Sequence, residues 1–280
     1  MAENKHQHYL PAFYLYNFTN EVQRNAAKGK EKRETKIYHF DFAKNCIKER
    51  PIRKVAIEPY LYSHRSEDGN YDHSLDHDIQ IVEDKAARAI QYFTDVMKSA
   101  LKEKPQNIKI ENTYMDNILD LLFWQIKRHP DLISDYKANC EQFLAAEDQS
   151  TSAAKAMTLE AIRQLGNRGE YDIKEELDKK NKIILCISSP HAHFITSDKP
   201  FVRVNSSRNN GIAVEGTEMY FPITSNMLLF MHNNGKNREF RLENDRPLLR
   251  KLNACIARHA SNYLFGSSQR YLQKIVKVNR

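Results

Sequence analysis

The sequence predicts an α+β fold, a single domain over residues 1–280 that packs a mixed or antiparallel sheet against a central helical bundle. Apolar residues recur at helical spacing through residues 74–180, whereas the apolar segments of residues 181–280 are short and strand-like. Helices and strands segregated along a chain in this way favour α+β architecture. With 41% hydrophobic and 28% charged residues, the 280-residue chain has the composition of a globular protein with a sizeable core.

The N-terminal part is predicted to hold a short helix and two strands. Residues 7–18 are dense in aromatic side chains, and the stretch after Pro11 is long enough for one or two helical turns. Residues 36–43 alternate, which predicts a strand, and residues 46–57 are expected to return as a second, less regular strand. Residues 21–35 are rich in Lys, Arg and Glu and are expected to form an exposed loop. The first strand would present an aromatic face made of Tyr38, Phe40 and Phe42.

The middle of the chain is predicted to be helical. From Leu75, apolar residues recur every three or four positions over roughly five turns, with Ser74 as the N-cap. A second helix is expected over residues 112–127, before Pro130 ends or kinks it. Three further helices fit residues 131–147, 151–165 and 172–180.

The last third changes to strands. Residues 182–189 form an apolar strand, and residues 218–224 and 227–233 are expected to pair. A helix is predicted over residues 247–260, where apolar residues recur at helical intervals. Shorter or weaker strands are predicted over residues 193–197, 239–244 and 274–278.

Charge is spread unevenly along the chain. The formal net charge of +7 comes from basic ends, because residues 1–54 carry +6 and residues 181–280 carry +9, whereas the middle is acidic. Basic ends favour a phosphate-rich partner, RNA or DNA, in a basic groove. The alternative is that the ends pack on the acidic middle, because asymmetry along a sequence does not by itself make a surface patch.

Several classes of protein are excluded by what the sequence lacks. No apolar run approaches the roughly 18 residues that span a bilayer, so no membrane association is expected. The first residues have no signal-peptide character, and the four cysteines include no C-x-x-C pair, which argues against a zinc ribbon. We therefore expect a cytoplasmic protein with free thiols. The chain carries no nucleotide-cofactor motif, and its sequence leaves the oligomeric state open.

The first candidate site is an acidic helix face. Asp76 and Glu83 are seven residues apart, two turns of a helix, so both carboxylates project from one side. Carboxylates on one face, with imidazoles nearby, can hold Mg²⁺ or Mn²⁺ or work as an acid–base pair. A solvated helix face is the alternative that spacing alone leaves open.

The second candidate lies at the end of the next helix, where Gln125, Arg128 and Pro130 follow the single tryptophan, Trp124. An arginine just before a proline break projects toward whatever the following loop encloses. It can clamp a phosphate or a carboxylate with two parallel hydrogen bonds. Equally, a basic residue at a helix C-terminus complements the helix dipole without any ligand.

Residues 196–200, Thr-Ser-Asp-Lys-Pro, follow an apolar strand and form the third candidate. Folds often present functional polar side chains where a strand ends, so Asp198 is a candidate metal ligand or base and Ser197 a candidate hydrogen-bonding group. The alternative is a turn that Asp198 caps before Pro200. A serine nucleophile is not expected, because the G-x-S-x-G arrangement is missing.

The fourth candidate is His8 with its neighbour Tyr9. His8 directly precedes an aromatic, proline-containing block that must pack against the rest of the protein. Its side chain is therefore expected to point inward, with Tyr9 as a candidate substrate-binding residue.

Together these four places resemble a bacterial family known as domain of unknown function 4238. Its members open with a His-Tyr-aliphatic-Pro-x-Phe-Tyr-Leu-x-x-Phe block, which residues 8–18 match. They then carry two acidic residues seven apart on a helix, an Arg-x-Pro helix end, a Thr-Ser-Asp-x-Pro turn, an aromatic-Pro-aliphatic strand and a late helical Asn. The matching positions here are Asp76 and Glu83, Arg128 and Pro130, 196–200, 221–223 and Asn253. The first helix acid, commonly Glu, is Asp76 in this chain, which shortens the reach of its carboxylate.

The resemblance implies one site and no particular activity. The residues that it assigns to that site are His8, Asp76, Glu83, Arg128 and Asp198. The candidate substrate-binding residues beside them are Tyr9, Gln125, Ser197 and Asn253. Genes of this family often lie in accessory bacterial gene neighbourhoods, so the resemblance is compatible with a defence or toxin role.

Two classes of function fit these residues. In the first, the protein is a metal-dependent phosphodiesterase or nuclease, in which Asp76, Glu83 and Asp198 hold Mg²⁺ or Mn²⁺. His8 would then act as general acid or base, Arg128 would steady a phosphate, and the basic termini would track the nucleic-acid backbone. In the second, the protein is a non-catalytic sensor that binds nucleic acid, a nucleotide or a protein, and the polar cluster is structural. A small-molecule hydrolase or transferase is a third alternative.

Overall fold

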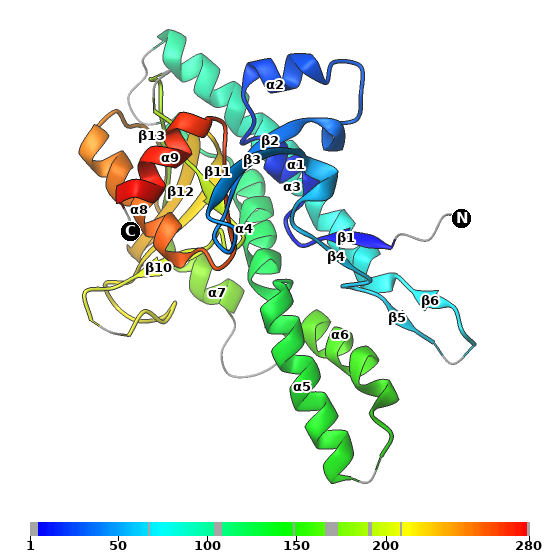
Figure 1. The fold of residues 1–280 in the computed structure, drawn as a ribbon. Coiled ribbons are helices and arrows are strands. Elements are labelled where there is room, and N and C mark those ends of the chain that lie inside the picture. The colour runs from blue at the N-terminus through cyan, green and yellow to red at the C-terminus, as the bar shows by residue number, and fades with distance from the viewer. Residues whose placement is uncertain are drawn as a thin grey trace.

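The long helices from the middle of the chain lie beside the strands of its last third, and the last two helices pack against the same strands (Figure 1). The computed structural model describes residues 5–66, 68–103, 108–147, 149–165, 173–189, 192–207 and 209–278. Residue 172, the first position of one predicted helix, lies outside these ranges. Over the described residues, long helices in the middle of the chain accompany a mixed sheet built mainly from its last third, so the predicted α+β class is confirmed.

The elements in chain order are as follows. The helices are α1 (Ala12–Tyr16), α2 (Glu21–Ala26), α3 (Ser74–Glu103), α4 (Asn112–Lys127), α5 (Pro130–Ala146), α6 (Ala154–Gln164), α7 (Ile173–Asp178), α8 (Arg246–His259) and α9 (Gln269–Val278), with 3-10 turns η1 (Lys32–Glu34), η2 (Ile52–Lys54) and η3 (Thr151–Ala153). The strands are β1 (His6–His8), β2 (Lys36–Asp41), β3 (Cys46–Pro51), β4 (Ile57–Pro59), β5 (His64–Arg65), β6 (Tyr71–Asp72), β7 (Ile108–Lys109), β8 (Lys180–Cys186), β9 (Thr196–Ser197), β10 (Val202–Val204), β11 (Glu218–Thr224), β12 (Met227–Asn234), β13 (Arg238–Leu242) and β14 (Tyr263–Gly266).

The main sheet has the strand order β10-β11-β12-β8-β13-β7, and only β13 and β8 run parallel. β11 and β12 pair as predicted, with Phe221 opposite Leu229. Successive residues of a strand face opposite sides, so Ile184 packs with α3 and α4 while Ile183 packs with α8 and α9. The sheet is therefore buried on both faces, which explains its nearly continuous apolar strands.

A second sheet, ordered β3-β2-β14-β9, joins the two ends of the chain. β14 pairs with β2 on one side and with β9 on the other. On β2 the burial does not follow the predicted aromatic face, because Ile37, His39 and Asp41 are buried along with Phe40. Strand β2 is covered on both sides, and the sequence pattern identified only one of them.

The N-terminal block, defined as residues 8–18, is buried between the helices and the C-terminal strands. The hydroxyl of Tyr14 donates to the carbonyl of Pro222 at 2.8 Å and bonds to Oγ1 of Thr196 at 2.7 Å. Tyr14, Leu15 and Phe18 are fully buried. The aromatic density of this block is therefore core packing between α1 and strands from the last third.

Two predicted elements differ from the structure. Asn20 and Gln23 form a reciprocal capping box that begins α2, so residues 21–26 of the expected exposed loop are helical, whereas residues 27–31 form a mostly exposed turn. Residues 274–278 are not a strand but the last turns of α9, which begins after the side chain of Ser268 accepts a hydrogen bond from the amide of Tyr271. The apolar run of residues 274–278 is too short to distinguish a strand from one face of a helix.

Helix α3 begins one residue earlier than predicted. Ser74 is the first residue of α3 rather than its N-cap, and its amide donates to the Asp72 carboxylate at 2.8 Å. Helix boundaries commonly shift by a residue or two when a neighbouring side chain supplies the cap.

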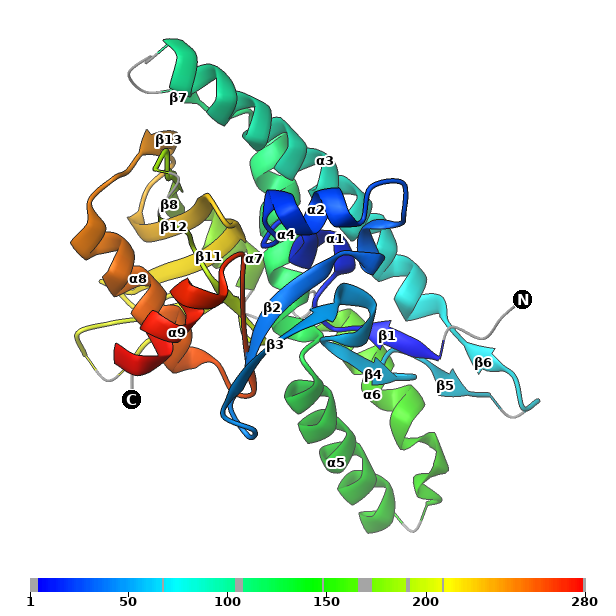
Figure 2. The same cartoon turned by 45° about the horizontal axis from the view of Figure 1, so that its top comes forward.

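α5 and α6 form a hairpin that projects from the body of the molecule (Figures 1 and 2).

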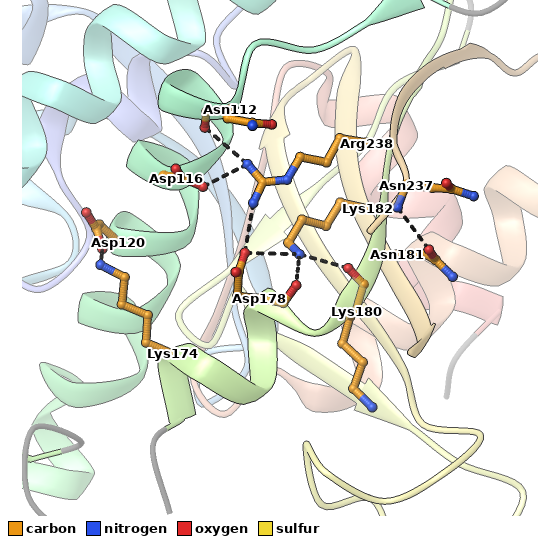
Figure 3. A network of polar contacts seen from close by, with 10 residues as sticks. All are labelled: Asn112, Asp116, Asp120, Lys174, Asp178, Lys180, Asn181, Lys182, Asn237 and Arg238. Atoms are coloured by element: carbon orange, nitrogen blue, oxygen red, sulfur yellow. Dashed lines mark hydrogen bonds and ion pairs between the residues drawn. The ribbon is translucent and has the colours of Figure 1, made fainter. Parts of the chain in front are cut away.

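A polar network joins the helices to the edge of the main sheet (Figure 3). Arg238 on β13 donates to Asp116 on α4 and to Asp178 on α7, each at 2.8 Å. The buried ammonium of Lys182 on β8 donates to the carbonyls of Asp178 at 2.6 Å and Lys180 at 2.8 Å. Burial lowers the pKa of Lys182 to about 8, so its ammonium loses a proton more easily than that of an exposed lysine.

Two predictions about the whole chain can be compared with the structure. All four cysteines are free thiols, as predicted. Over the described residues, none of the helices combines the length and the apolar character that crossing a bilayer requires.

Candidate functional site

The centre of the predicted site is a buried ion pair between α3 and α4. Arg128, at the C-terminal end of α4, is 0% exposed, and its Nη1 donates to Oε1 of Glu83 at 2.6 Å. The Glu83 side chain is 23% exposed, so the anionic end of the pair reaches solvent while the cationic end does not. Because a guanidinium keeps its proton inside a protein, a buried one has to be satisfied by acceptors.

Gln125 supplies further acceptors to the guanidinium. With its amide oxygen toward Arg128, it accepts from Nε at 2.7 Å and also from Nη2. In that orientation its amide nitrogen donates to the carbonyl of Tyr9 at 3.3 Å. The hydroxyl of Tyr62 donates to the carbonyl of Arg128 at 3.2 Å. Arg128 and its neighbours therefore tie the N-terminal block to the end of α4.

His8 and Asp76 flank the ion pair electrostatically. Burial lowers the pKa of His8 to about 4, and the charge of Arg128 contributes to that shift. Burial also raises the pKa of Glu83, the charge of Arg128 opposes this rise, and the like charge of Asp76 adds to it. The charge of Arg128 thus acts on both His8 and Glu83, and the charge of Asp76 acts on Glu83, so four of the five predicted site residues lie in one neighbourhood.

Asp198 has a different position and caps a turn. Its two carboxylate oxygens accept from the amide of Ser261 at 3.0 Å and from that of Asn262 at 2.6 Å. Burial raises the pKa of Asp198, and these amide bonds oppose the rise. The hydroxyl of Ser197 donates to the carbonyl of Lys199 at 2.8 Å. The Asp198 carboxylate therefore holds the segment before β14 rather than a turn before Pro200, and it fastens β9 to the start of β14. The local contacts of the Thr-Ser-Asp-Lys-Pro segment come from Ser197, whose hydroxyl also accepts from the amide of Lys199 at 3.2 Å.

The three predicted metal ligands do not form one set. In the part of the chain that the structure describes, no group of three or more His, Cys, Asp or Glu side chains is arranged to hold a metal ion. The charge of Asp76 acts on Glu83, whereas that of Asp198 acts on Tyr9 and His129. Binding of Mg²⁺ or Mn²⁺ by Asp76, Glu83 and Asp198 stays a prediction that this arrangement does not support.

Asn253 is fully buried, and its side-chain polar atoms form hydrogen bonds within the protein. Its Oδ1 accepts from the amide of Ile195 at 3.0 Å. Its Nδ2 donates to the carbonyl of His193 at 2.9 Å and to the hydroxyl of Tyr271 at 3.1 Å. The residue connects α8 to the segment before β9 and to α9.

A basic groove with a partly apolar lining lies between α8 and α9. It has a volume of about 760 Å³, and its walls include Arg246 and Arg250 from α8 with Lys274 and Lys277 from α9. The two helices lie side by side in both views of the fold (Figures 1 and 2). None of the described lining residues is acidic, and within the described ranges none of these four cations is in an ion pair.

The groove was not predicted from the sequence, although the sequence carries a signal for it. The excess of basic residues over 181–280 pointed to this region. A strand over residues 274–278, however, would place Lys274 and Lys277 on opposite faces. On a helix, residues three apart share a face, so the correct secondary structure gathers the two charges.

The family follows from the sequence match. The family model described as "Protein of unknown function (DUF4238)" matches residues 6–270. The chain belongs to this family. The match includes every predicted site residue of this DUF4238 protein, from His8 to Asn253. No curated protein and no solved structure matches the chain, so family membership comes without a named activity.

Proposed function

We propose that this DUF4238 protein is a non-catalytic module that binds single-stranded RNA or DNA in the groove between α8 and α9. One observation carries the proposal: a groove of about 760 Å³ with four exposed cations and, among the described lining residues, no acidic side chain. Lysine and arginine side chains bind phosphates and release the counter-ions condensed on the nucleic acid. That release supplies affinity that does not depend on base sequence.

The apolar part of the groove supports a single strand as the ligand. Leu249 and Ile275 line it, and Tyr271 adds an aromatic side chain whose hydroxyl is held by Asn253. Proteins that bind single strands without sequence preference combine a cationic groove with aromatic side chains on which bases stack. A hollow of this size suits a few nucleotides of one strand.

In this proposal the Glu83–Arg128 pair is structural. Gln125 and Glu83 accept hydrogen bonds from the Arg128 guanidinium, and the buried residue has no exposure to offer a phosphate. The network supports the packing of the N-terminal block against α4.

The test is fluorescence anisotropy with labelled single-stranded RNA and DNA at several salt concentrations. The Arg250→Ala/Lys274→Ala variant should bind more weakly, and its plot of log affinity against log salt should flatten by about 0.7 for each phosphate contact removed. The matched control is Lys85→Ala/Arg88→Ala, which removes two exposed cations from α3. Absence of binding by the wild type, or equal weakening in the control, would overturn the proposal.

A metal-dependent phosphodiesterase or nuclease is the second candidate. It is favoured by the electrostatic effects of Arg128 on His8 and Glu83 and of Asp76 on Glu83, which gather these four residues at one place. A metal ion bound there would have to compete with Arg128 for Glu83, since their present contact is 2.6 Å.

Calorimetry with Mn²⁺ and Mg²⁺ tests this candidate. The Asp76→Asn/Glu83→Gln variant is compared with wild type, and circular dichroism confirms its folding. Binding that disappears in a folded variant, together with RNA or DNA cleavage by the wild type alone, would favour the enzyme over the binding module. Wild-type protein that binds neither ion would exclude it.

A further inference from the structure

A small cavity, here called the Tyr9 cavity, lies among β2, β3, β4 and the end of β1. Its volume is about 120 Å³, and it shares no lining residue with the groove between α8 and α9. Its buried lining residues with polar side chains are Tyr9, His39 and Asp41, which are 6%, 3% and 6% exposed. Its mouth includes the exposed cations Arg50 and Lys54. The cavity therefore has a buried polar base and a basic rim.

His39 has an unused hydrogen-bonding atom at this base. Its Nδ1 is buried and has no partner among the described residues. The ring also makes a hydrogen bond to the backbone of Lys48, which favours a proton on the other ring nitrogen. Burial lowers the pKa of His39 to about 4, so the ring is neutral near pH 7. Nδ1 is then an acceptor that lacks a donor, which is uncommon for a buried polar atom.

Asp41 adds a second acceptor. Its carboxylate accepts from the amide of Lys44 at 3.0 Å and pairs with the Lys44 ammonium at 3.3 Å. A carboxylate has about four lone-pair positions, so it can accept further hydrogen bonds. Two acceptors at the base call for a ligand with hydroxyl donors.

The positive charge of the rim favours an anionic group on the same ligand. Arg50 and Lys54 are in no ion pair within the described part of the chain, whereas Lys44 is already paired with Asp41. Glu58 is the other acidic residue of the lining, so two unpaired cations face one carboxylate at the mouth. A phosphate ester can bind both cations through charge-assisted hydrogen bonds.

We propose that the Tyr9 cavity binds a small phosphorylated sugar, with its hydroxyl groups toward His39 and Asp41 and its phosphate at Arg50 and Lys54. The enclosed space equals that of only about four water molecules in the liquid, so it takes the hydroxyl-bearing edge of one sugar unit, and the rest of the ligand lies at the mouth. The aromatic side chain of Tyr9 lies against the sugar. This site is independent of the groove proposed for nucleic acid, because it uses other residues.

The test is calorimetry with three probes: ribose 5-phosphate, ribose and inorganic phosphate. Ribose 5-phosphate binds, and each of the other two binds at least about tenfold more weakly, because each lacks one half of the recognised chemistry. No binding of ribose 5-phosphate would overturn the proposal. Phosphate that binds as tightly as ribose 5-phosphate would also overturn it, because the site would then recognise only an anion.

Variants separate the two halves of the site. Arg50→Ala/Lys54→Ala weakens ribose 5-phosphate binding about tenfold or more, whereas Lys28→Ala/Lys30→Ala, which removes two exposed cations outside the cavity, leaves it unchanged. His39→Phe keeps an aromatic ring in place, removes the acceptor and weakens ribose 5-phosphate more than phosphate. Thermal melting confirms that each variant is folded. Equal losses in the two double variants, or an unchanged affinity in folded His39→Phe, would contradict the assignment.

Discussion

Replacement of Glu83 by Gln removes the negative charge that faces Arg128 and leaves an amide oxygen in a similar position. The Arg128 side chain is 1% exposed and loses its only ion-pair partner in the described part of the chain. Removal of one partner of a fully buried pair costs about 3–5 kcal/mol, whereas an exposed pair contributes about 0–1 kcal/mol. Glu83 is mostly but not wholly buried, and Gln can still accept a hydrogen bond. We therefore expect Glu83→Gln to lower the free energy of unfolding by about 2–3 kcal/mol.

Urea unfolding at pH 7, followed by circular dichroism, measures this loss. The matched control is Asp84→Asn, which removes the same charge one residue later from an exposed position on α3. It should change the free energy of unfolding by no more than about 0.5 kcal/mol. A Glu83→Gln variant as stable as wild type, or more stable, would refute the structural role. It would show instead that Glu83 is held near Asp76 at a cost in stability, as in a site that awaits a ligand.

Two further predictions concern buried polar groups. The pKa values of His8 and His39 are lowered to about 4 in the folded protein from 6.5, so the unfolded chain binds protons first and stability falls as the pH drops from 6.5 to 4. Each histidine changes the free energy of unfolding by up to about 1.4 kcal/mol per pH unit. Urea midpoints measured across this range should therefore vary less steeply with pH in His39→Phe than in the wild type. An unchanged dependence on pH would contradict the lowered pKa of His39. Tyr14→Phe removes a hydroxyl bonded to Thr196 and Pro222, and it should lower the free energy of unfolding by about 1–2 kcal/mol in the same assay. A loss below about 0.5 kcal/mol would show that the Pro222 carbonyl and the Thr196 hydroxyl find other hydrogen-bond partners.

Long periodic segments were predictable because one face of each helix is buried. The predicted helix over residues 112–127 has the same bounds as α4, and the stripe that begins at Leu75 lies in α3. The strand pair of residues 218–224 and 227–233 was also correct, because both strands are apolar and the connection between them is short. In these segments local pattern and tertiary burial agree.

Short segments were not predictable, because their structure depends on partners distant in the sequence. The run at residues 274–278 contains too few positions to separate a strand from a helix, and the burial of Ile275 against α8 and β14 decides for the helix. Similarly, residues 21–35 looked like a charged loop, yet the side chain of Asn20 also donates to the carbonyl of Ser267 at 2.8 Å and anchors the start of α2.

The candidate site shows the same division. The sequence alone established the spacing of Asp76 and Glu83 on one helix and the placement of Arg128 at the end of another. It also indicated membership of the DUF4238 family, which the match over residues 6–270 confirms. Only the tertiary structure decided that Glu83 pairs with Arg128 while Asp198 caps the turn before β14. It also decided that the basic C-terminal residues line one groove. The physical reason is that periodicity specifies which face of an element a side chain occupies, whereas the charge or amide opposite that face comes from segments that only folding brings near.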